Sequence, residues 1–375
     1  MTAGRIRVDQ LLPAAHVRDA TGESALHLAA GLERAGFEAG IYALTIDREL
    51  AGRVQPMHAF EPPGGSDVTI LHYALASPLD SALLDCAGKR VIVYHNLTPP
   101  EMLLPTSPEV ARLTMVGRDQ LVELARSNGV DLAIGVSEYN TEDLRRVGFS
   151  RTTTLPLPID LERYDVESEP VFAEQLAWPG QVFITVGRLA PNKRLEDFLR
   201  VAAYYNRHVH SSSYFYIAGG GQGSEGYTTA LMDLYYELDL INRVVFLGRV
   251  SHRDLVTLYR AADVYLCTSA HEGFCAPLVE AMHFGVPILA RHSTAIPETL
   301  GNAGVTYSHD DPARIAEALR VLSHDQPLRT RLQHNARRRV AYFSPSVVIP
   351  RWISALAELA GVRADAALGA PAESS

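Results

Sequence analysis

The sequence predicts an α/β protein made of two Rossmann-like lobes that follow one another along the chain. Short runs rich in β-branched and aromatic residues alternate with segments of helical period from one end to the other. That alternation is typical of parallel sheets covered by helices on both faces. The chain has 375 residues, whereas a single domain usually holds about 100 to 200 residues. Two domains are therefore expected.

Ten apolar runs are expected to form the strands. In the first half they cover residues 5–11, 40–44, 67–72, 91–95 and 131–136, and in the second half residues 182–186, 214–218, 244–247, 264–268 and 286–290. Open α/β sheets bind ligands beyond the carboxyl ends of their strands, so polar residues just after these runs are candidates for function. His72 and His95 occupy such positions, and a structural role is expected for His72.

The connection between the lobes is expected near residues 158–175. Pro156 and Pro158 fix φ and lack backbone donors, which favours an extended connector over a core strand. We expect an N-terminal domain over residues 1–165 and a C-terminal domain over residues 166–349. A helix over residues 350–363 is expected to return to the first domain, and the small, polar residues 364–375 predict a disordered tail.

Composition excludes several classes of function. The formal net charge is −9 and Lys and Arg form no long run, so nucleic acid is not an expected partner. No stretch approaches the roughly 20 apolar residues that span a bilayer, so any membrane contact would be peripheral. Cys86, Cys267 and Cys275 form neither a C-x-x-C pair nor a zinc-ligand pattern. A reducing, cytoplasmic setting without a bound metal is expected.

The segment His271–Glu280 is the strongest candidate for chemistry. It follows an expected strand and opens a helix, whose first turn exposes unpaired amides and the positive end of the helix dipole. Glu272 would precede that helix, and Glu280 would lie about one turn inside it, where a carboxylate can bind neighbouring hydroxyl groups of a ribose. A single Glu at such a place is usually an ordinary helix-start acid, but two around Gly273-Phe274 favour a binding site.

A second candidate follows the expected strand 182–186. Arg188 and Lys193 are five residues apart on a strand-to-helix loop. A planar guanidinium and a mobile ammonium at this spacing can converge on one pyrophosphate and offset its charge. A solvated basic loop is the plain alternative.

A glycine run at Gly221–Gly226 formally matches the G-x-G-x-x-G dinucleotide fingerprint. The next strand should then end in an acidic residue that binds a ribose, but it continues into Arg249-Val250. The run also lies in the middle of the chain instead of opening a domain. A dehydrogenase is therefore disfavoured.

These motifs together resemble the retaining GT-B glycosyltransferases of the GT4 family. Glu272 and Glu280 match the E-x7-E signature of that family, and Cys275 stands where many members have Gly. The surrounding matches fall in family order over residues 180–320: Gly187-Arg188, Pro191-Asn192-Lys193, Ala218-Gly219-Gly220-Gly221, Val245-Phe246-Leu247-Gly248, Ala262-Asp263-Val264, Glu280-Ala281-Met282, Gly285-Val286-Pro287 and Ile296-Pro297-Glu298. The resemblance implies two Rossmann-like domains facing each other across a cleft, with residues 1–165 binding the acceptor and residues 166–349 binding the donor.

The resemblance also implies a role for each residue of the C-terminal motifs. Arg188 and Lys193 would hold the donor diphosphate, Glu280 the ribose, and Glu272 the donor sugar. The pocket for the sugar would be lined by the backbone of four residues, Gly273, Phe274, Cys275 and Ala276. The nucleobase would lie near Val250. No metal would be required, and the nucleotide sugar would be a co-substrate and not a resident cofactor.

The first lobe matches the family more loosely. Asp19–Ser24 resembles the glycine-containing loop that approaches the diphosphate, although it keeps only Gly22. His95 falls where relatives place a histidine that faces the donor sugar, which makes it a candidate catalytic residue beside Glu272. Residues 94–101 also resemble bacterial members that add mannose or related hexoses to polysaccharides.

The expected activity is transfer of a hexosyl unit, with GDP-mannose or a UDP-hexose as donor, to a glycan, a lipid-linked acceptor or a small molecule. Retaining transfer in this fold needs no protein nucleophile, because the leaving phosphate oxygen takes the acceptor proton. Three alternatives share the fold: a nucleotide-sugar 2-epimerase, a glycoside phosphorylase and a non-catalytic nucleotide-sugar-binding protein. The residues leave the acceptor and the oligomeric state open.

Overall fold

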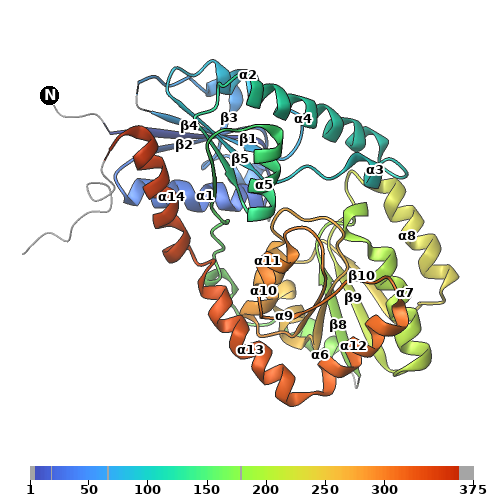
Figure 1. The fold of residues 1–375 in the computed structure, drawn as a ribbon. Coiled ribbons are helices and arrows are strands. Elements are labelled where there is room, and N and C mark those ends of the chain that lie inside the picture. The colour runs from blue at the N-terminus through green and yellow to red at the C-terminus, as the bar shows by residue number, and fades with distance from the viewer. Residues whose placement is uncertain (1–4, 18, 66, 178–179, 363–375) are drawn as a thin grey trace, which may run out of the picture. The chain divides into compact units, whose positions relative to one another are not determined.

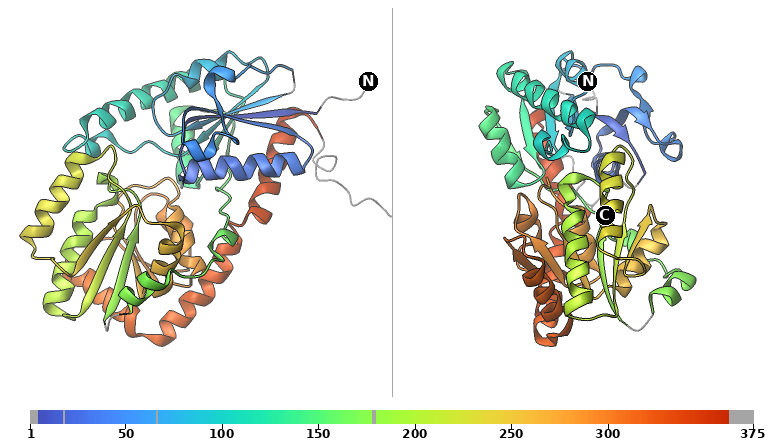
Figure 2. Two further views of the ribbon diagram at one scale, coloured as in Figure 1. Left: turned by 180° about the vertical axis from the view of Figure 1, so that it is seen from behind. Right: turned by 90° about the vertical axis from the view of Figure 1, so that its right-hand side faces the viewer.

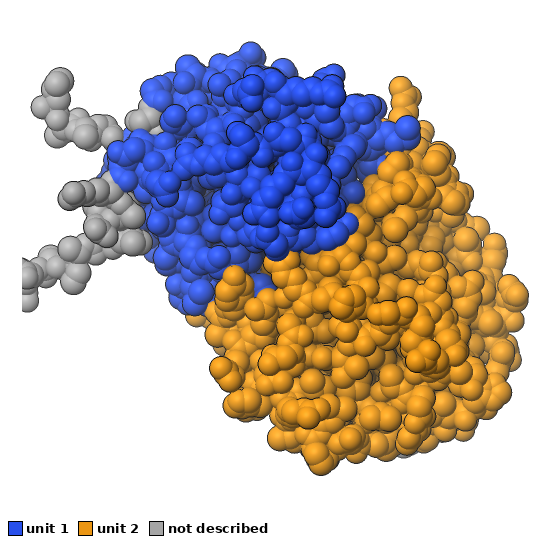
Figure 3. Space-filling view, viewed as in Figure 1, with its two compact units in different colours: residues 1–97, 113–160, 343–375 blue, residues 98–112, 161–342 orange. Residues whose placement is uncertain are grey.

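A computed structural model of the chain describes residues 5–17, 19–65, 67–177 and 180–362. The chain forms two compact units (Figure 3). Unit 1 consists of residues 1–97, 113–160 and 343–375, and unit 2 of residues 98–112 and 161–342. The segment 98–112 thus leaves unit 1 and joins unit 2 before the chain returns. The expected tail, residues 364–375, lies outside the described residues.

Unit 1 is built on a parallel sheet of seven strands in the order β3-β2-β1-β4-β5-β6-β7 (Figure 1). Neighbouring strands pair in parallel throughout. The strands are β1 (Arg7–Ala15), β2 (Glu38–Ile46), β3 (Gln55–Pro56), β4 (Val68–Tyr73), β5 (Lys89–Tyr94), β6 (Leu132–Gly135) and β7 (Thr152–Thr154). The order reverses at β1, and this reversal is where doubly wound folds bind their ligands.

Unit 2 repeats this design with six parallel strands in the order β10-β9-β8-β11-β12-β13. The strands are β8 (Gln181–Val186), β9 (Ser213–Ala218), β10 (Val244–Gly248), β11 (Val264–Cys267), β12 (Ile288–Arg291) and β13 (Val305–Tyr307). Counted within the unit, this is the 3-2-1-4-5-6 order of the Rossmann fold. The expected α/β class with two Rossmann-like lobes is confirmed.

The helices of unit 1 surround its sheet. They are α1 (Ala20–Arg34), α2 (Leu79–Leu84), most of α4 (Pro108–Arg126), α5 (Glu138–Val147) and α14 (Pro345–Ala360), with short 3-10 turns η1 (Arg48–Leu50) and η2 (Met57–Ala59). α14 lies beside α1 (Figures 1 and 2). A Cβ on Gly31 of α1 would lie 2.3 Å from a side-chain carbon of Ile349 in α14, so glycine permits this close packing.

Unit 2 contains nine helices among its described residues, most of them packed around its sheet. They are α3 (Pro100–Leu103), α6 (Pro170–Leu176), α7 (Leu195–His208), α8 (Glu225–Glu237), α9 (His252–Ala261), α10 (Ala276–His283), α11 (Ile296–Leu300), α12 (Pro312–His324) and α13 (Gln326–Ala341), with 3-10 turns η3 (Glu162–Tyr164) and η4 (Pro191–Lys193). α9 begins with a capping box between Ser251 and Asp254. Side chains of α7, α8 and α12 form one buried cluster with the strands.

The structure corrects several sequence expectations. Three edge strands, β3, β7 and β13, were not expected, because each has only two or three residues and too little apolar alternation to stand out. The last helix begins at Pro345 and not at residue 350, and Pro350 lies inside it. Pro350 and Ser346 are both exposed, so solvent can satisfy the Ser346 carbonyl that Pro350 leaves without a donor.

The connector between the units is extended, and unit 1 holds it. Residues 155–160 form neither helix nor strand. The carbonyl of Pro156 accepts from the indole of Trp352 at 3.0 Å, and Ile159 donates its amide to the carbonyl of Phe343 at 2.9 Å. No helix among the described residues is long and apolar enough to cross a membrane.

Candidate functional site

Hydrogen bonds join the loop after β8 to the loop after β11. Asn192 donates from Nδ2 to the carbonyl of His271 at 2.9 Å, and its own carbonyl accepts from the amide of Ala270 at 2.8 Å. The hydroxyl of Thr268 donates to the carbonyl of Lys193 at 2.8 Å. These bonds fix the backbone of Lys193 at the carboxyl edge of the unit 2 sheet, which is the edge where doubly wound folds bind ligands.

Lys193 and Glu272 contact one another directly. Nζ of Lys193 lies 2.6 Å from Oε1 of Glu272, and the two side chains are 18% and 10% exposed. Burial lowers the pKa of the Lys193 ammonium, but the attraction and hydrogen bond of Glu272, together with the nearby Cys275 and Cys267, leave that pKa raised. Lys193 is therefore cationic at neutral pH, and the two residues hold each other in place.

Arg188 lies on the same loop and is exposed. Its Nη2 reaches the carbonyl of Gln222 at 3.4 Å, a long contact that leaves the guanidinium accessible to an anion. The backbones beneath it approach closely, because a Cβ on Gly219 would lie 1.8 Å from the carbonyl oxygen of Gly187. Glycine at position 219 thus brings the loops after β8 and β9 together.

The glycine run that matches the dinucleotide fingerprint has packing reasons of its own. A Cβ on Gly221 would lie 2.3 Å from the hydroxyl of Thr228, and one on Gly226 would lie 2.5 Å from the carbonyl of Thr106. Both glycines are therefore required by neighbouring atoms of unit 2. The run needs no bound dinucleotide to explain it.

A tight turn leads from Glu272 into α10. Cys275, the N-cap residue, has φ 69° and ψ 64°, a left-handed conformation that is uncommon outside glycine. The hydroxyl of Thr299 donates to the carbonyl of Phe274 at 2.5 Å and holds the turn from below. Among the described residues, the amides of Gly273, Cys275 and Ala276 have no hydrogen-bond acceptor. Amides at the start of a helix can bind an anionic or hydroxyl oxygen.

Glu280 is buried one turn inside α10, and both of its oxygens have partners. The hydroxyl of Tyr259 donates to Oε2 at 2.8 Å, and Nη2 of Arg163 lies 3.4 Å from Oε1. Arg163 also donates to the hydroxyl of Tyr164 at 2.6 Å. Burial and the adjacent Glu280 raise the pKa of Tyr259, so its hydroxyl stays a donor. The carboxylate is thus positioned in advance.

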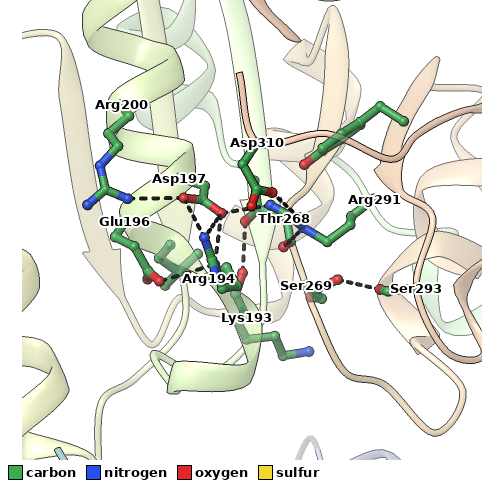
Figure 4. Close-up of polar contacts among 12 residues, drawn as sticks. Lys193, Arg194, Glu196, Asp197, Arg200, Thr268, Ser269, Arg291, Ser293 and Asp310 are labelled. Atoms are coloured by element: carbon green, nitrogen blue, oxygen red, sulfur yellow. Dashed lines mark hydrogen bonds and ion pairs between the residues drawn. The ribbon is translucent and has the colours of Figure 1, made fainter. Parts of the chain in front are cut away.

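A buried ion cluster supports the Lys193 loop (Figure 4). Asp197 of α7 accepts from Nε of Arg194 at 2.8 Å, from Nη1 of Arg200 at 3.1 Å and from Nη2 of Arg291 at 2.7 Å. Nε of Arg291 also donates to the carbonyl of Thr268 at 3.0 Å. Since Thr268 bonds the Lys193 backbone, the cluster closes a ring of hydrogen bonds around the start of α7.

Sequence reasoning missed the residues that support Glu280 and Lys193. Arg163 and Tyr164 follow the connector without any motif, and Tyr259 reads as an ordinary core residue of an amphipathic helix. Asp197 lies in the first turn of α7, where an acid is usual because of the helix dipole. Only the fold brings these side chains to the motifs, so no local pattern could have singled them out.

Val250 lies half-buried between β10 and α9. Its neighbour Arg249 packs on the loop after β9, since a Cβ on Gly220 would lie 3.2 Å from Cγ of Arg249. The turn after β10 is therefore close to the glycine-rich turn after β9. Among the described residues, no group of three or more His, Cys, Asp or Glu side chains is arranged to hold a metal ion.

In unit 1, His95 directly follows β5. Its amide donates to the carbonyl of Tyr73 at 2.9 Å, and its Nε2 lies 2.9 Å from Nδ1 of His72. Burial lowers the pKa of His95 to about 4, and burial together with His95 lowers the pKa of His72 well below its usual value. Both rings are therefore neutral at pH 7.

Gly22 does not lie in a loop. The expected loop at Asp19–Ser24 is the first turn of α1, with Asp19 as its N-cap. The amide of Gly22 donates to Oδ2 of Asp19 at 3.0 Å. The side chain of Asp19 thus already accepts the hydrogen bond of the Gly22 amide at the start of the helix. The expected backbone contact from Gly22 to a ligand could form only if this bond were broken.

Comparison with known proteins agrees with this arrangement. Residues 171–339 match the family model described as glycosyl transferases group 1. D-inositol 3-phosphate glycosyltransferase of Saccharomonospora viridis is 26% identical over 300 residues, which cover 76% of this chain and 68% of that protein. Its counterpart in Corynebacterium diphtheriae is 31% identical over 75% of this chain and 60% of its own length. O-antigen chain mannosyltransferase B of Escherichia coli is 32% identical over 46% of this chain and 45% of its own.

Solved structures show the same fold over nearly the whole chain. Sucrose-phosphate synthase of Thermosynechococcus elongatus has a TM-score of 0.72 at 19% identity and covers 95% of this chain and 99% of its own. Anabaena HepE in complex with UDP-glucose has a TM-score of 0.72 at 18% identity, over 94% and 100%. The chain spans 45 to 68% of the length of the three curated relatives. Family model, relatives and fold agree: residues 171–339 match the group 1 glycosyltransferases, the sequence is GT4-like, and the fold is that of the GT-B glycosyltransferases.

Proposed function

We propose that the protein transfers a hexosyl unit from a nucleoside diphosphate sugar to a hydroxyl group of a glycan, a lipid-linked acceptor or a small molecule, with retention of anomeric configuration. The pairing of Lys193 with Glu272 next to the start of α10 carries this proposal. It places a fixed cation, a carboxylate and unpaired amides at the carboxyl edge of one Rossmann-like sheet.

Each residue has a role that follows from its chemistry. Arg188 and Lys193 bind the diphosphate and offset the charge that develops on it as the sugar leaves. Glu272 accepts from hydroxyl groups of the sugar, with the amides of Gly273 to Ala276 beside it. Glu280, held by Tyr259 and Arg163, accepts from the ribose. The nucleobase lies near Val250, and His95 contacts the sugar.

The chemistry assigned to these groups is positioning and charge stabilisation. The leaving phosphate oxygen takes the proton of the acceptor hydroxyl, so no protein nucleophile and no metal ion is required. Glu272 holds Lys193, and a bound diphosphate would share that cation. The diphosphate brings negative charges of its own into the site, and Arg188 and Lys193 together would offset them.

The donor is proposed to be GDP-mannose or a UDP-hexose. The Escherichia coli relative is named as a mannosyltransferase, and HepE was solved with UDP-glucose. The relatives from Saccharomonospora and Corynebacterium are named as inositol phosphate glycosyltransferases, which favours a small hydroxylated acceptor as one candidate.

A thermal-shift screen tests the proposal. The protein is heated with GDP, UDP, ADP and dTDP, with their sugar conjugates and with NAD(P), since a ligand that binds only the folded state raises the melting temperature. A selective shift that Lys193→Met and Arg188→Ala abolish supports it. Arg320→Ala is the matched control, because Arg320 forms an ion pair with exposed Glu317 on α12, away from the Lys193 loop. A shift that survives both variants, or a response to NAD(P) alone, contradicts it.

The competing activities are separated by their products. A 2-epimerase releases a free sugar from the donor without an acceptor, and a phosphorylase turns over with inorganic phosphate and no nucleotide. A binding protein shifts its melting temperature but shows no turnover with any acceptor. Transfer that depends on both the nucleotide sugar and an added hydroxyl compound identifies the transferase.

A further inference from the structure

Three polar side chains of unit 1 form a continuous line that ends at His95. Gln10 is on β1, His72 is on β4 and His95 follows β5, and these strands are neighbours in the sheet. Gln10 pairs with Ile70, and His72 pairs with Val93. Because side chains alternate along a strand, this register puts all three polar groups on one face. Gln10 and His72 are 0% and 1% exposed.

Hydrogen bonds join these side chains without a gap. Nε2 of Gln10 donates to the carbonyl of Ala25 in α1 at 2.9 Å, and Oε1 of Gln10 lies 3.0 Å from Nε2 of His72. Nδ1 of His72 lies 2.9 Å from Nε2 of His95, and the two rings are inclined by 23° with centroids 5.2 Å apart. We call this line the Gln10 relay.

The carbonyl of Ala25 determines the direction of every bond in the relay. A carbonyl only accepts, so Gln10 must turn its NH₂ group to Ala25 and its oxygen to His72. His72 must then donate from Nε2. A neutral His72 has only a lone pair at Nδ1, so His95 must carry its proton on Nε2 and donate it to His72.

We propose that Gln10 and His72 are positioning residues that set the tautomer of His95 and leave Nδ1 of His95 as an acceptor for a hydroxyl group of the donor sugar. Among the described residues, Nδ1 of His95 has no hydrogen-bond partner. A nitrogen without a proton cannot donate to a phosphate oxygen. The relay therefore assigns His95 to the hydroxyl-bearing part of the donor, and in this it rests on the proposed function.

Nitrogen NMR of the full-length, ligand-free chain tests the tautomer directly. The protein is labelled with ¹⁵N in its histidines, and His95→Gln identifies the signals of His95 among the 14 histidines. At pH 7 we expect the proton of His95 on Nε2. A proton on Nδ1 would overturn the proposal whatever the protein binds.

Variants of Gln10 then test the relay. Gln10→Met has similar volume and no acceptor, so His72 is free to reverse and the second tautomer of His95 should appear. Gln10→Glu in its neutral acid form can donate to the carbonyl of Ala25 and accept from His72, and in that form it should restore the proton of His95 to Nε2. Thr69→Val is the matched control, since Thr69 is equally buried on β4 and bonds Cys86 instead of the relay. An unchanged His95 tautomer in Gln10→Met contradicts the assigned role.

Binding measurements separate positioning from general stability. Calorimetry compares UDP-glucose with UDP, or GDP-mannose with GDP, according to the thermal-shift screen. Gln10→Met should weaken the sugar conjugate by about fivefold to tenfold, the equivalent of one hydrogen bond, and leave the bare diphosphate unchanged. In a His95→Ala background, Gln10→Met should cause no further loss.

The outcomes distinguish this inference from the proposed function. Equal weakening of both ligands, or losses that add in the His95→Ala background, would mean that Gln10 acts on the fold and not through His95. If the wild-type chain binds no nucleotide sugar, the proposed function fails, and the NMR result alone decides whether the relay sets the tautomer.

Discussion

Asp197→Asn should destabilise unit 2 and loosen the loop that carries Lys193. Asp197 is 5% exposed and accepts from Arg194, Arg200 and Arg291. Asparagine keeps the shape of the side chain but removes the negative charge. Three guanidinium groups then lie near one another without the negative charge of their common partner. Removing one partner of a buried ion pair destabilises the folded state, because the remaining charge stays buried without compensation.

The size of the effect follows from the exposure of each partner. Arg291 is 12% exposed, so its bond to Asp197 counts as a buried charged hydrogen bond, worth about 1.5 to 3 kcal/mol. Arg194 and Arg200 are 34% and 47% exposed and are screened by water, so each pair contributes about 0 to 1 kcal/mol. The expected loss is about 3 kcal/mol, or about 6 to 12 °C in Tm for a domain of this size.

Differential scanning calorimetry measures this shift, and Asp310→Asn is the matched control. Asp310 pairs with the same Arg291 but is 62% exposed, so its loss should lower the Tm by no more than about 4 °C. The Asp197 variant should also bind the nucleoside diphosphate more weakly, because the Lys193 backbone loses its support. Equal shifts for the two variants would refute the argument that burial decides the energy.

Three further predictions concern single groups. Glu280→Gln should weaken nucleoside diphosphate binding about tenfold in calorimetry, the equivalent of one charged hydrogen bond. Glu317→Gln on α12 is the control and should not change the affinity. If Glu280→Gln binds the nucleoside diphosphate as tightly as the wild-type chain does, Glu280 is not part of the site. The free energy of unfolding should fall as the pH drops from about 6.5 towards 4, because burial depresses the pKa of His95 to about 4 and only the unfolded chain binds a proton there in this range. The expected slope is up to about 1.4 kcal/mol per pH unit. Urea unfolding between pH 6.5 and 5 should show a shallower slope for His95→Gln than for the wild-type chain. Asp80→Asn should stabilise unit 1 by about 1 to 2 kcal/mol above pH 6 and have no effect below about pH 4. Burial and Glu123 raise the pKa of Asp80 to about 6, so ionisation of this carboxyl group destabilises the native state. A variant less stable than the wild-type chain at pH 7 would contradict this.

The sequence predicted the elements that carry a strong local signal. All ten apolar runs became strands, and nine of them lie inside a sheet, because a buried parallel strand needs an unbroken apolar run; the tenth, β10, lies at one edge of the unit 2 sheet. The turn before α10 was also predictable, since Pro277 and the flanking carboxylates mark a helix start. Arg188, Lys193, Glu272 and Glu280 could be named as candidates because they lie on the loops that follow two recognisable strands or within the first turns of a recognisable helix.

The remaining features depend on contacts between distant segments. Tyr259 and Arg163 meet Glu280 only after α9 and η3 pack against α10, and nothing near them in the chain indicates that partner. The helix start at Gly22 was missed because a glycine followed by a polar residue resembles a loop, whereas the Asp19 cap turns it into α1. The last helix was expected to begin at residue 350, but it begins one turn earlier, because a proline on the solvent side of a helix is tolerated.

The return of α14 to unit 1 has a consequence for synthesis on the ribosome. The sheet of unit 1 can form once β7 is made, but α14, with Trp352 buried against the connector, follows only after residues 161–342. At about 5 to 20 residues per second, that interval lasts roughly 10 to 40 seconds. During this interval the face of α1 around Gly31, which α14 later covers, is exposed, so the nascent chain presents an apolar surface that chaperones can bind. Unit 2 can therefore finish folding before unit 1 does.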